Sequence, residues 1–250
     1  MDYLKLEDRV VIITGGSRGI GECAAQLFSR QGAKVVILDK RDELGQGVAA
    51  KICAEGGTAV FKTCDTTDTD RIKTVIDEVI TEYGQIDVLI NHAGIGANRL
   101  LIEEVTDREW EHLMDTNLKS CFNMCREVIP HMKKRKYGKI IFSSSGAGVA
   151  GEAYNSHYAV TKAGLISLAK SLSLELAEYQ INVNAIAIPS IRTPGSLDTD
   201  FDSDMDAEIP EIPMRRLGLP EDVANLMLYL SSDVSSYVSG QAIAPNGGKR

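Results

Sequence analysis

Residues 10–21 read VVIITGGSRGIG: a short β-branched run, a glycine-rich turn and the start of an amphipathic helix. In such a strand–turn–helix unit, one glycine permits the tight turn and another lets the backbone approach a pyrophosphate. The last glycine, Gly21, lets the helix pack closely on the strand. Free N–H groups at the helix start then meet the phosphates. The stretch therefore predicts a dinucleotide-binding turn at the end of a buried strand.

The rest of the chain repeats this alternation of apolar runs and helical stretches. Amphipathic spacing predicts helices over 21–31, 70–83 and 223–230, and a capping box from Thr106 to Glu109 predicts another helix start. Apolar strands separated by helices are typical of a parallel sheet covered on both faces. We expect an α/β fold in one domain, residues 1–250: a Rossmann-type doubly wound parallel sheet of seven strands, with helices on both faces. The expected strands are 10–14, 34–38, 59–63, 87–90, 139–142, 182–187 and 241–244.

Composition limits the partners and the compartment. The net charge of −8 disfavours nucleic acid and anionic membranes, which both require a basic face. The longest aliphatic runs have the length of strands, and the N-terminus has no apolar run suited to a signal peptide, so we expect no membrane segment. The five cysteines show no zinc-ligand spacing and the four histidines no metal-like grouping. This predicts free thiols, a cytoplasmic protein and no bound metal.

Asp39 ends the second expected strand, 18 residues after Gly21. An acid at this place accepts hydrogen bonds from an adenosine ribose, and its charge repels a 2′-phosphate. The cofactor expected from this spacing is therefore NAD. A surface aspartate at a strand end is the plainer alternative, and Arg18 in the glycine turn could itself serve a phosphate.

Tyr158 and Lys162 are four residues apart, so on a helix the phenol and the ammonium lie on one face. A free tyrosine is a poor base at neutral pH, because its pKa is about 10. A lysine cation and the positive ring of an oxidised nicotinamide both favour the phenolate. The pair predicts a proton-transfer group for hydride exchange between a nicotinamide and an alcohol or ketone. A contact on a helix surface is the alternative interpretation.

Together these features resemble the short-chain dehydrogenase/reductase family, in its common form of about this length, over roughly residues 5–248. The segment 91–94 is similar to its Asn-Asn-Ala-Gly motif, and 216–222 and 239–241 to its C-terminal signatures. Ser145 stands where the family has a substrate-polarising serine, and Asn117 where it has an asparagine that completes a proton relay. The resemblance implies the catalytic residues Asn117, Ser145, Tyr158 and Lys162.

The same resemblance implies what each group does. In oxidation, Ser145 holds the substrate oxygen and Tyr158 removes the hydroxyl proton as hydride passes to the nicotinamide; Lys162 binds the nicotinamide ribose. The substrate-binding residues expected are Ser145, Glu152, Asn155 and Tyr158. The NAD-binding residues expected are Gly15, Ser17, Arg18, Gly19, Ile20, Gly21, Asp39, Asp65, Thr66, Asn91, Ala93, Gly94, Tyr158, Lys162, Pro189, Ile191 and Thr193.

The chain departs from the family pattern in two places that bear on the site. His92 replaces an asparagine that is mainly structural in the family, and we interpret it as a packing residue. Ile188-Pro189 stands where the family has Pro-Gly, in a segment that lies against the nicotinamide in relatives. Thr193 still falls where the family has a threonine near the carboxamide.

The stretch 198–211 contains seven acidic residues and no basic ones. A solvated surface loop is the plainer interpretation. A calcium loop is disfavoured because Met205 stands where such a loop requires glycine. We expect 194–214 to form a substrate flap, with 196–212 poorly ordered until substrate binds, because little in it could serve as an anchor.

The main expectation is an NAD-dependent oxidoreductase for a small secondary alcohol or ketone. One alternative is a 3-oxoacyl carrier-protein reductase, which normally uses NADPH and a basic patch; Asp39 and the acidic stretch disfavour it. Another is a catalytically silent NAD-binding sensor or scaffold, which Ile188-Pro189 leaves open. Helices 107–133 and 157–178 match those that pair between subunits in relatives. We therefore expect a homotetramer. The alternating burial that this pairing requires is compatible with Leu165, Leu168, Leu172 and Leu176.

Overall fold

The computed structural model describes residues 4–193 and 205–249. Seven strands form one sheet in the order β3-β2-β1-β4-β5-β6-β7, and every pairing is parallel, as the sequence predicts. β5 extends three residues beyond its expected end and so includes Ser145. The strands are β1 (Val10–Thr14), β2 (Lys34–Asp39), β3 (Thr58–Thr63), β4 (Val88–Asn91), β5 (Gly138–Ser145), β6 (Ile181–Ile188) and β7 (Ala242–Ile243).

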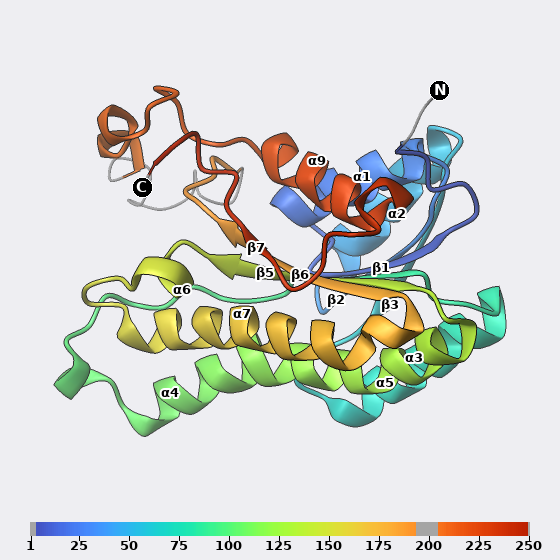
Figure 1. Ribbon diagram of the computed structural model, residues 1–250, viewed down its shortest axis with the longest axis horizontal. Coiled ribbons are helices and arrows are strands. Elements are labelled where there is room, and N and C mark those ends of the chain that lie inside the picture. The colour runs from blue at the N-terminus through green and yellow to red at the C-terminus, as the bar shows by residue number, and fades with distance from the viewer. Residues whose placement is uncertain (1–3, 194–204, 250) are drawn as a thin grey trace.

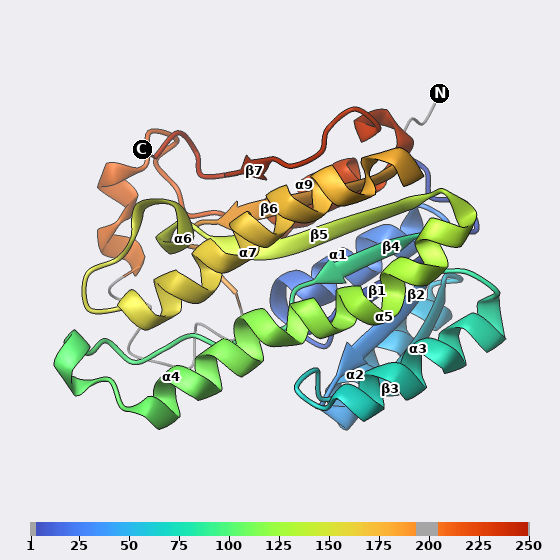
Figure 2. The same cartoon turned by 60° about the horizontal axis from the view of Figure 1, so that its bottom comes forward.

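Helices cover both faces of the sheet (Figures 1 and 2). On one face lie α1 (Gly19–Arg30), α2 (Asp42–Ala54) and α9 (Pro220–Ser231). On the other lie α3 (Thr69–Tyr83), α4 (Asp107–Leu113), the π-helical segment η2 (Met114–Lys119), α5 (Ser120–Arg135) and α7 (Ser156–Leu176). Two buried apolar clusters, one under each helical layer, form the core. The short elements are α6 (Ala147–Ala150) and the 3₁₀ turns η1 (Ile102–Glu104), η3 (Ala177–Tyr179), η4 (Ile209–Glu211) and η5 (Asp233–Ser235).

Two helices begin where local signals in the sequence predict a helix start. Thr106 Oγ1 accepts a hydrogen bond from the Glu109 N–H at 3.2 Å, and the Glu109 carboxylate accepts from the Thr106 N–H at 3.0 Å. This capping box satisfies donors that a helix start would otherwise leave unpaired. α9 begins at Pro220, whose missing N–H costs nothing at a first helical position. No helix in the described part of the chain is both long and apolar enough to cross a bilayer.

The sheet order reverses between β1 and β4, which are neighbours although β2 and β3 separate them in sequence. In open α/β sheets, ligands bind in the crevice outside the carboxyl ends of the strands at such a switch point. In Figure 2 the arrowheads of β4 and β6 point left, toward the edge where α6 and the start of α7 lie. The fold therefore places the glycine turn, Asp39, Ser145 and the start of α7 at one edge.

The expected flap is anchored where the structure describes it. Met205, Ile212 and Leu217 are buried together. Glu208 accepts hydrogen bonds from Ser190 Oγ at 2.9 Å and from Lys249 Nζ at 2.8 Å. The expectation that little could anchor 196–212 is thus wrong for 205–212, because partners distant in sequence supply the contacts. The remainder of the expected flap, 194–204, lies outside the described residues.

Candidate functional site

A cavity of about 550 Å³ opens at the carboxyl ends of the strands, beside the switch point. Its volume lies in the range of small-molecule and cofactor sites. It is lined by Gly15, Arg18, Gly19, Ile20, Leu38, Asp39, Lys40, Arg41, Cys64, Asp65, Thr66, His92, Ala93, Gly94, Ile95, Gly96, Thr116 and Thr193. Most of the residues expected to bind a dinucleotide thus line this one cavity.

The glycine turn lines the start of α1. Gly15 has a φ of 71°, and a Cβ there would lie 2.9 Å from the Cα of Ala93. A Cβ on Gly21 would lie 2.2 Å from the carbonyl oxygen of Gly15, so only glycine lets the helix approach its own turn. The first N–H groups of α1 have no partners within the helix and are suited to phosphate oxygens. The residues present fit a dinucleotide pyrophosphate.

Asp39 is buried, with 6% of its surface exposed, at the end of β2. Ser17 Oγ donates to one carboxylate oxygen at 2.5 Å, and the Arg41 N–H donates to the other at 3.2 Å. Ser17 therefore holds Asp39 in place rather than lining the cavity itself. Lys40, Arg41 and Arg18 also line this end of the cavity. Lys40 and Arg41 were not predicted, although two basic residues directly after Asp39 were a signal that could have found them.

Asp65 lies farther along the same wall, after β3. Its carboxylate accepts hydrogen bonds from the N–H and the hydroxyl of Thr67, at 2.9 and 2.8 Å. The backbone hydrogen bond from Thr67 lowers the pKa of Asp65 below its usual range. Asp65 is therefore an ionised acceptor, held by its own turn, beside the buried Thr66.

Tyr158 and Lys162 lie on the first turns of α7 and converge, as their spacing predicts. Lys162 Nζ lies 5.5 Å from the centroid of the Tyr158 ring. The ammonium is buried and donates to the carbonyl oxygen of Ser143 at 3.0 Å. Tyr158 is half-buried. A cation is thus fixed beside a partly accessible phenol.

Asn117 lies in the π-helical segment η2 and is fully buried. Its Oδ1 accepts from the Ile95 N–H at 2.8 Å, and its Nδ2 donates to the Ile95 carbonyl at 2.9 Å. A Cβ on Gly94 would lie 3.0 Å from Asn117 Oδ1 and 3.4 Å from Lys162 Nζ. The segment 94–95 therefore brings Asn117 and Lys162 to the end of the cavity that Gly94 and Ile95 line.

Three of the four residues expected to contact substrate, Ser145, Glu152 and Asn155, make side-chain hydrogen bonds within the chain. Ser145 Oγ accepts from the Ala147 N–H at 3.2 Å. The Glu152 carboxylate accepts from Arg99 and from Asn155 Nδ2, both at 3.1 Å. Glu152 therefore joins two loops beside the site, which weakens the expectation that it binds a polar substrate.

Seven of the residues expected to bind the cofactor are absent from the described lining of the cavity: Ser17, Gly21, Asn91, Tyr158, Lys162, Pro189 and Ile191. Asn91 is buried beneath it and donates to Cys125 Sγ at 3.7 Å. Ile191 packs in the apolar core, and its backbone bridges to Gly218. Pro189 lies before it on the same segment. Thr193, two residues after Ile191, does line the cavity. The assignment of Asn91, Pro189 and Ile191 to the cofactor stays a prediction.

His92 lies on the cavity wall rather than serving only as packing. Its Nδ1 shares a hydrogen bond of 3.0 Å with Ser143 Oγ. Burial, together with the nearby Lys162 cation, lowers the pKa of His92 to about 4, so the ring is neutral near pH 7. The sequence indicated only that this position departs from the family pattern.

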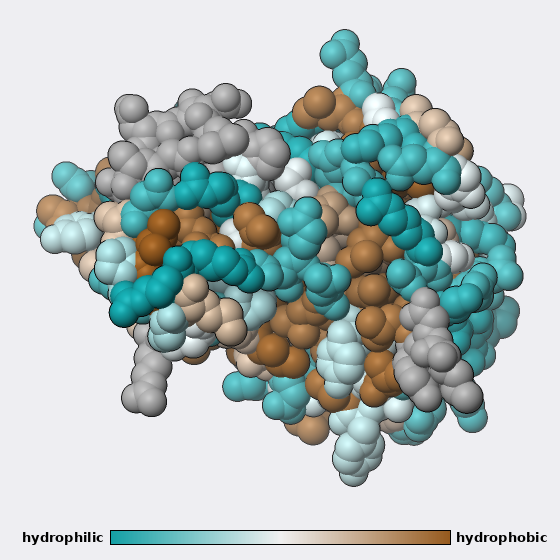
Figure 3. Space-filling model, turned by 90° about the horizontal axis from the view of Figure 1, so that it is seen from above, coloured by the Kyte–Doolittle hydropathy of each residue, from teal (hydrophilic) through white to brown (hydrophobic). Residues whose placement is uncertain are grey.

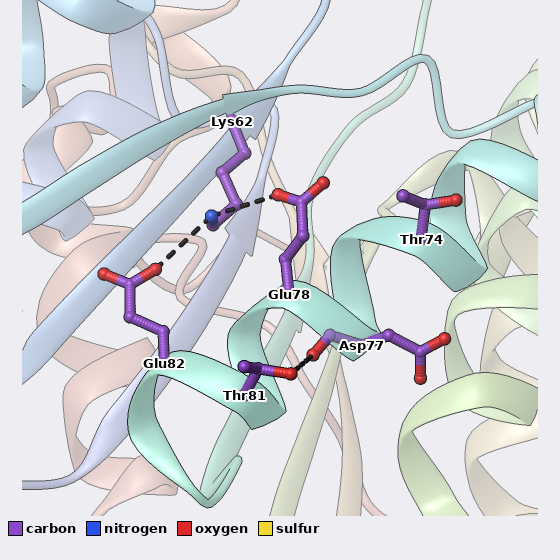
Figure 4. A pocket seen from close by; sticks show the side chains of 6 residues that line it. All are labelled: Lys62, Thr74, Asp77, Glu78, Thr81 and Glu82. Atoms are coloured by element: carbon purple, nitrogen blue, oxygen red, sulfur yellow. Dashed lines mark hydrogen bonds and ion pairs between the residues drawn. The ribbon is translucent and has the colours of Figure 1, made fainter.

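A second hollow of about 540 Å³ lies on the outer side of α3 and is wide open to solvent (Figure 4). Lys62 Nζ lies 3.1 Å from Glu78 and 3.4 Å from Glu82, and Thr81 Oγ1 donates to the Asp77 carbonyl. These charges compensate one another on an exposed surface. Across the residues that the structure describes, no group of His, Cys, Asp or Glu is suited to a metal. The cavity at the switch point is therefore the candidate site.

Comparisons with known proteins agree with this geometry. The family described as "Enoyl-(Acyl carrier protein) reductase" matches residues 15–250. A protein of Chlamydia trachomatis named "3-oxoacyl-[acyl-carrier-protein] reductase FabG" is 38% identical over 249 residues, 97% of this chain and 98% of the relative. A protein of Thermotoga maritima with the same name is 37% identical, over 98% of this chain and 99% of the relative.

Solved structures are similar over nearly the whole chain. A crystal structure titled "gox2181" has a TM-score of 0.94 and 29% identity, covering 98% of this chain and 97% of that one. Levodione reductase has a TM-score of 0.93 and 27% identity, covering 98% of both chains. With the glycine turn, the Tyr158–Lys162 pair and the sheet order, these matches show that the chain belongs to the short-chain dehydrogenase/reductase family of oxidoreductases.

Proposed function

We propose that this chain interconverts a ketone and a secondary alcohol, with NAD(H) as the hydride carrier and Tyr158 as the proton-transferring group. One observation carries the proposal. Lys162 and Asn117, from two different helices, meet beside Gly94 and Ile95 at the end of the cavity that also contains Asp39, and Lys162 Nζ lies 5.5 Å from the centroid of the Tyr158 ring. A phenol, a fixed cation and a dinucleotide cradle are the groups that this reaction needs.

The chain's own residues move the proton. A bound nicotinamide supplies or accepts the hydride. In reduction, Tyr158 donates its proton to the carbonyl oxygen of the substrate, which becomes the hydroxyl. The Lys162 ammonium stabilises the phenolate that remains, and Ser145 donates a hydrogen bond to the reacting oxygen. Asn117 orders the water that returns a proton to Tyr158. Oxidation runs these steps in reverse.

The relatives favour a particular ketone. Those reported above are named as 3-oxoacyl carrier-protein reductases and match this chain over 97–98% of its length. They support a 3-oxoacyl thioester as the substrate more strongly than the small alcohols expected from the sequence. The family assignment itself supports oxidoreduction only.

The cofactor is proposed from Asp39. Its buried carboxylate suits the two hydroxyls of an adenosine ribose, and its charge repels a 2′-phosphate. Arg18, Lys40 and Arg41 line the same end of the cavity and favour NADP(H). We give Asp39 the larger weight because Ser17 holds it rigidly in place.

The test is an assay of the purified protein with NADH and NADPH against acetoacetyl-coenzyme A, a set of cyclic ketones and a set of secondary alcohols. We expect NADH oxidation with the 3-oxoacyl thioester. Turnover confined to the cyclic ketones or alcohols would return the substrate to the expectation from the sequence. Tight NADH binding without turnover on any substrate would favour the sensor alternative.

We also propose a cytoplasmic homotetramer. All five cysteines are free thiols, as expected in a reducing compartment. Phe122 on α5 is 48% exposed and Leu174 on α7 is 83% exposed, and apolar side chains also gather on the face seen in Figure 3, which carries α9. On the inner face of α7, Leu165 and Leu176 are buried in this chain's own core. Light scattering at micromolar concentration should give the mass of four chains.

A further inference from the structure

His92 is fixed through both its backbone and its ring. Its N–H donates to Thr14 Oγ1 at 2.9 Å, and its Nδ1 shares the hydrogen bond with Ser143 Oγ. The register of β4 on β5 pairs Asn91 with Phe142, so His92 and Ser143 are the next opposed residues. The ring therefore ties the end of β4 to β5 at the cavity wall.

Ser143 is also the residue that holds Lys162. Its carbonyl accepts from Lys162 Nζ at 3.0 Å, and the neighbouring Ser144 Oγ donates to the Lys162 carbonyl at 2.7 Å. A Cβ on Gly94, two residues after His92, would lie 3.4 Å from the same ammonium. Lys162 Nζ thus lies close both to the segment that begins at His92 and to the strand to which His92 is bonded.

We propose that His92 is a positioning residue for Lys162, acting through Ser143 to fix the ammonium relative to Tyr158 and the cofactor. The proposal rests on the proposed roles of Tyr158 and Lys162. His92 itself does not take the proton. It needs to be neutral, because a charged ring would repel the Lys162 ammonium.

The charges around the ring agree with this requirement. Burial and the Lys162 cation both lower the pKa of His92, and Asp39 on β2 opposes them without cancelling their effect. The ring therefore binds Ser143 in its neutral form across the pH range in which the enzyme would be assayed. Of its two nitrogens, Nδ1 is the one that bonds to Ser143.

The experiment is a pair of double-mutant cycles read by NADH fluorescence titration. His92→Phe keeps a ring and removes the hydrogen bond, and Ser143→Ala removes its other partner. Each should weaken NADH binding by about 3- to 10-fold, the value of one net hydrogen bond. The double variant that carries both changes should bind NADH no more weakly than either single variant. In the Lys162→Ala background, His92→Phe should have no further effect on NADH affinity.

The second readout is the pH dependence of kcat for alcohol oxidation. His92→Phe should move the pH of half-maximal kcat upward by about half a unit, because a displaced ammonium favours the phenolate less. His92→Asn keeps a hydrogen-bonding group and should recover most of both effects. His131→Phe, the same change at a half-buried histidine of α5 outside the cavity lining, is the matched control.

A His92→Phe effect on NADH affinity that persists undiminished in the Lys162→Ala background would overturn the proposal. So would a loss of thermal stability without any change in the affinity or the pH profile. If His92→Phe fails to fold, Ser143→Ala reports on the same hydrogen bond. Because the binding cycles need no turnover, they decide the role of His92 even if the wild type proves inactive on every substrate.

Discussion

The two edges of the sheet both contain buried charges, but they use them differently. At the amino edge, Asp87 is 0% exposed and accepts four hydrogen bonds: from the Val10 N–H, Gln85 and Arg135, each at 2.8 Å, and from Arg9 at 3.3 Å. At the carboxyl edge, Asp39 and Lys162 adjoin a cavity. Burial of a charge is therefore a poor guide to function, because both edges show it.

Two tyrosines sharpen the same contrast, since each lies beside a cation. Arg9 stacks on the Tyr137 ring at 4.1 Å, but the Tyr137 hydroxyl donates to Asp233 at 2.8 Å. Burial, with the hydrogen bond to Asp233, raises the pKa of Tyr137 well above its ordinary value, so it stays a donor. Tyr158 lies beside Lys162 at the start of α7 instead. The hydrogen bond to a neighbouring acid keeps the proton on the Tyr137 phenol even though a cation stacks on its ring.

The largest expected effect tests this contrast between the tyrosines. Tyr158→Phe removes only the hydroxyl and should lower kcat by about 10²-fold or more, since general acid–base catalysis contributes at least that much. NADH affinity should change little. Tyr137→Phe is the matched control and should leave kcat unchanged. Equal turnover by wild type and Tyr158→Phe would exclude Tyr158 as the proton-transferring group.

The next effect concerns the amino edge. Asp87→Ala leaves Arg9 and Arg135 without their shared buried partner, and breaking a buried ion pair typically costs about 3 kcal/mol of unfolding free energy. Urea denaturation measures it, and the NADH affinity of the folded protein should stay the same. For contrast, Asp65→Ala removes an exposed acid of the cavity wall, and it should weaken NADH binding more than it lowers stability. If Asp87→Ala weakened NADH binding and Asp65→Ala mainly lowered stability, the amino edge could not be assigned to stability and the carboxyl edge to binding.

A smaller effect concerns the choice of cofactor. We expect a higher kcat/KM with NADH than with NADPH, because the Asp39 charge faces the added phosphate. Asp39→Ser should reduce the ratio of kcat/KM for NADH to that for NADPH by about 10-fold, mainly by lowering KM for NADPH. The reason is that the substitution removes one like-charge contact of roughly 1.4 kcal/mol. Steady-state kinetics with both cofactors measure this. A wild-type preference for NADPH would instead indicate that Arg18, Lys40 and Arg41 bind the 2′-phosphate.

The smallest effect concerns the pH dependence of stability. The pKa of His92 is lowered to about 4 in the folded chain. The unfolded chain, in which a histidine has a pKa of about 6.5, takes up the proton first as the pH falls. Stability is therefore lost as the pH drops from about 6.5 toward 4. Between pH 7 and pH 5, wild type should lose about 1 to 2 kcal/mol more than His92→Asn in urea denaturation. Equal losses of stability in the two proteins would indicate that the His92 ring is exposed to solvent in the folded chain.

Much of the fold was predictable because its signals are local. The apolar runs gave all seven strands, and Thr106 and Pro220 mark helix starts that the structure confirms. The glycine turn and the Tyr158–Lys162 spacing were equally readable, since both follow from the geometry of one turn or one helix. They lie at the same edge of the sheet because parallel strands all end there.

The sequence by itself therefore determined the sheet, the glycine turn and the Tyr158–Lys162 pair. The tertiary structure alone decided the bonds between residues far apart: Ser17 with Asp39, Glu208 with Lys249, and His92 with Ser143. It also decided that Ile191 faces the core while Thr193 faces the cavity. The physical reason is that helical period and glycine backbone freedom act over a few residues. Contacts across 22 to 51 positions depend on strand register and core packing, which the whole chain sets together.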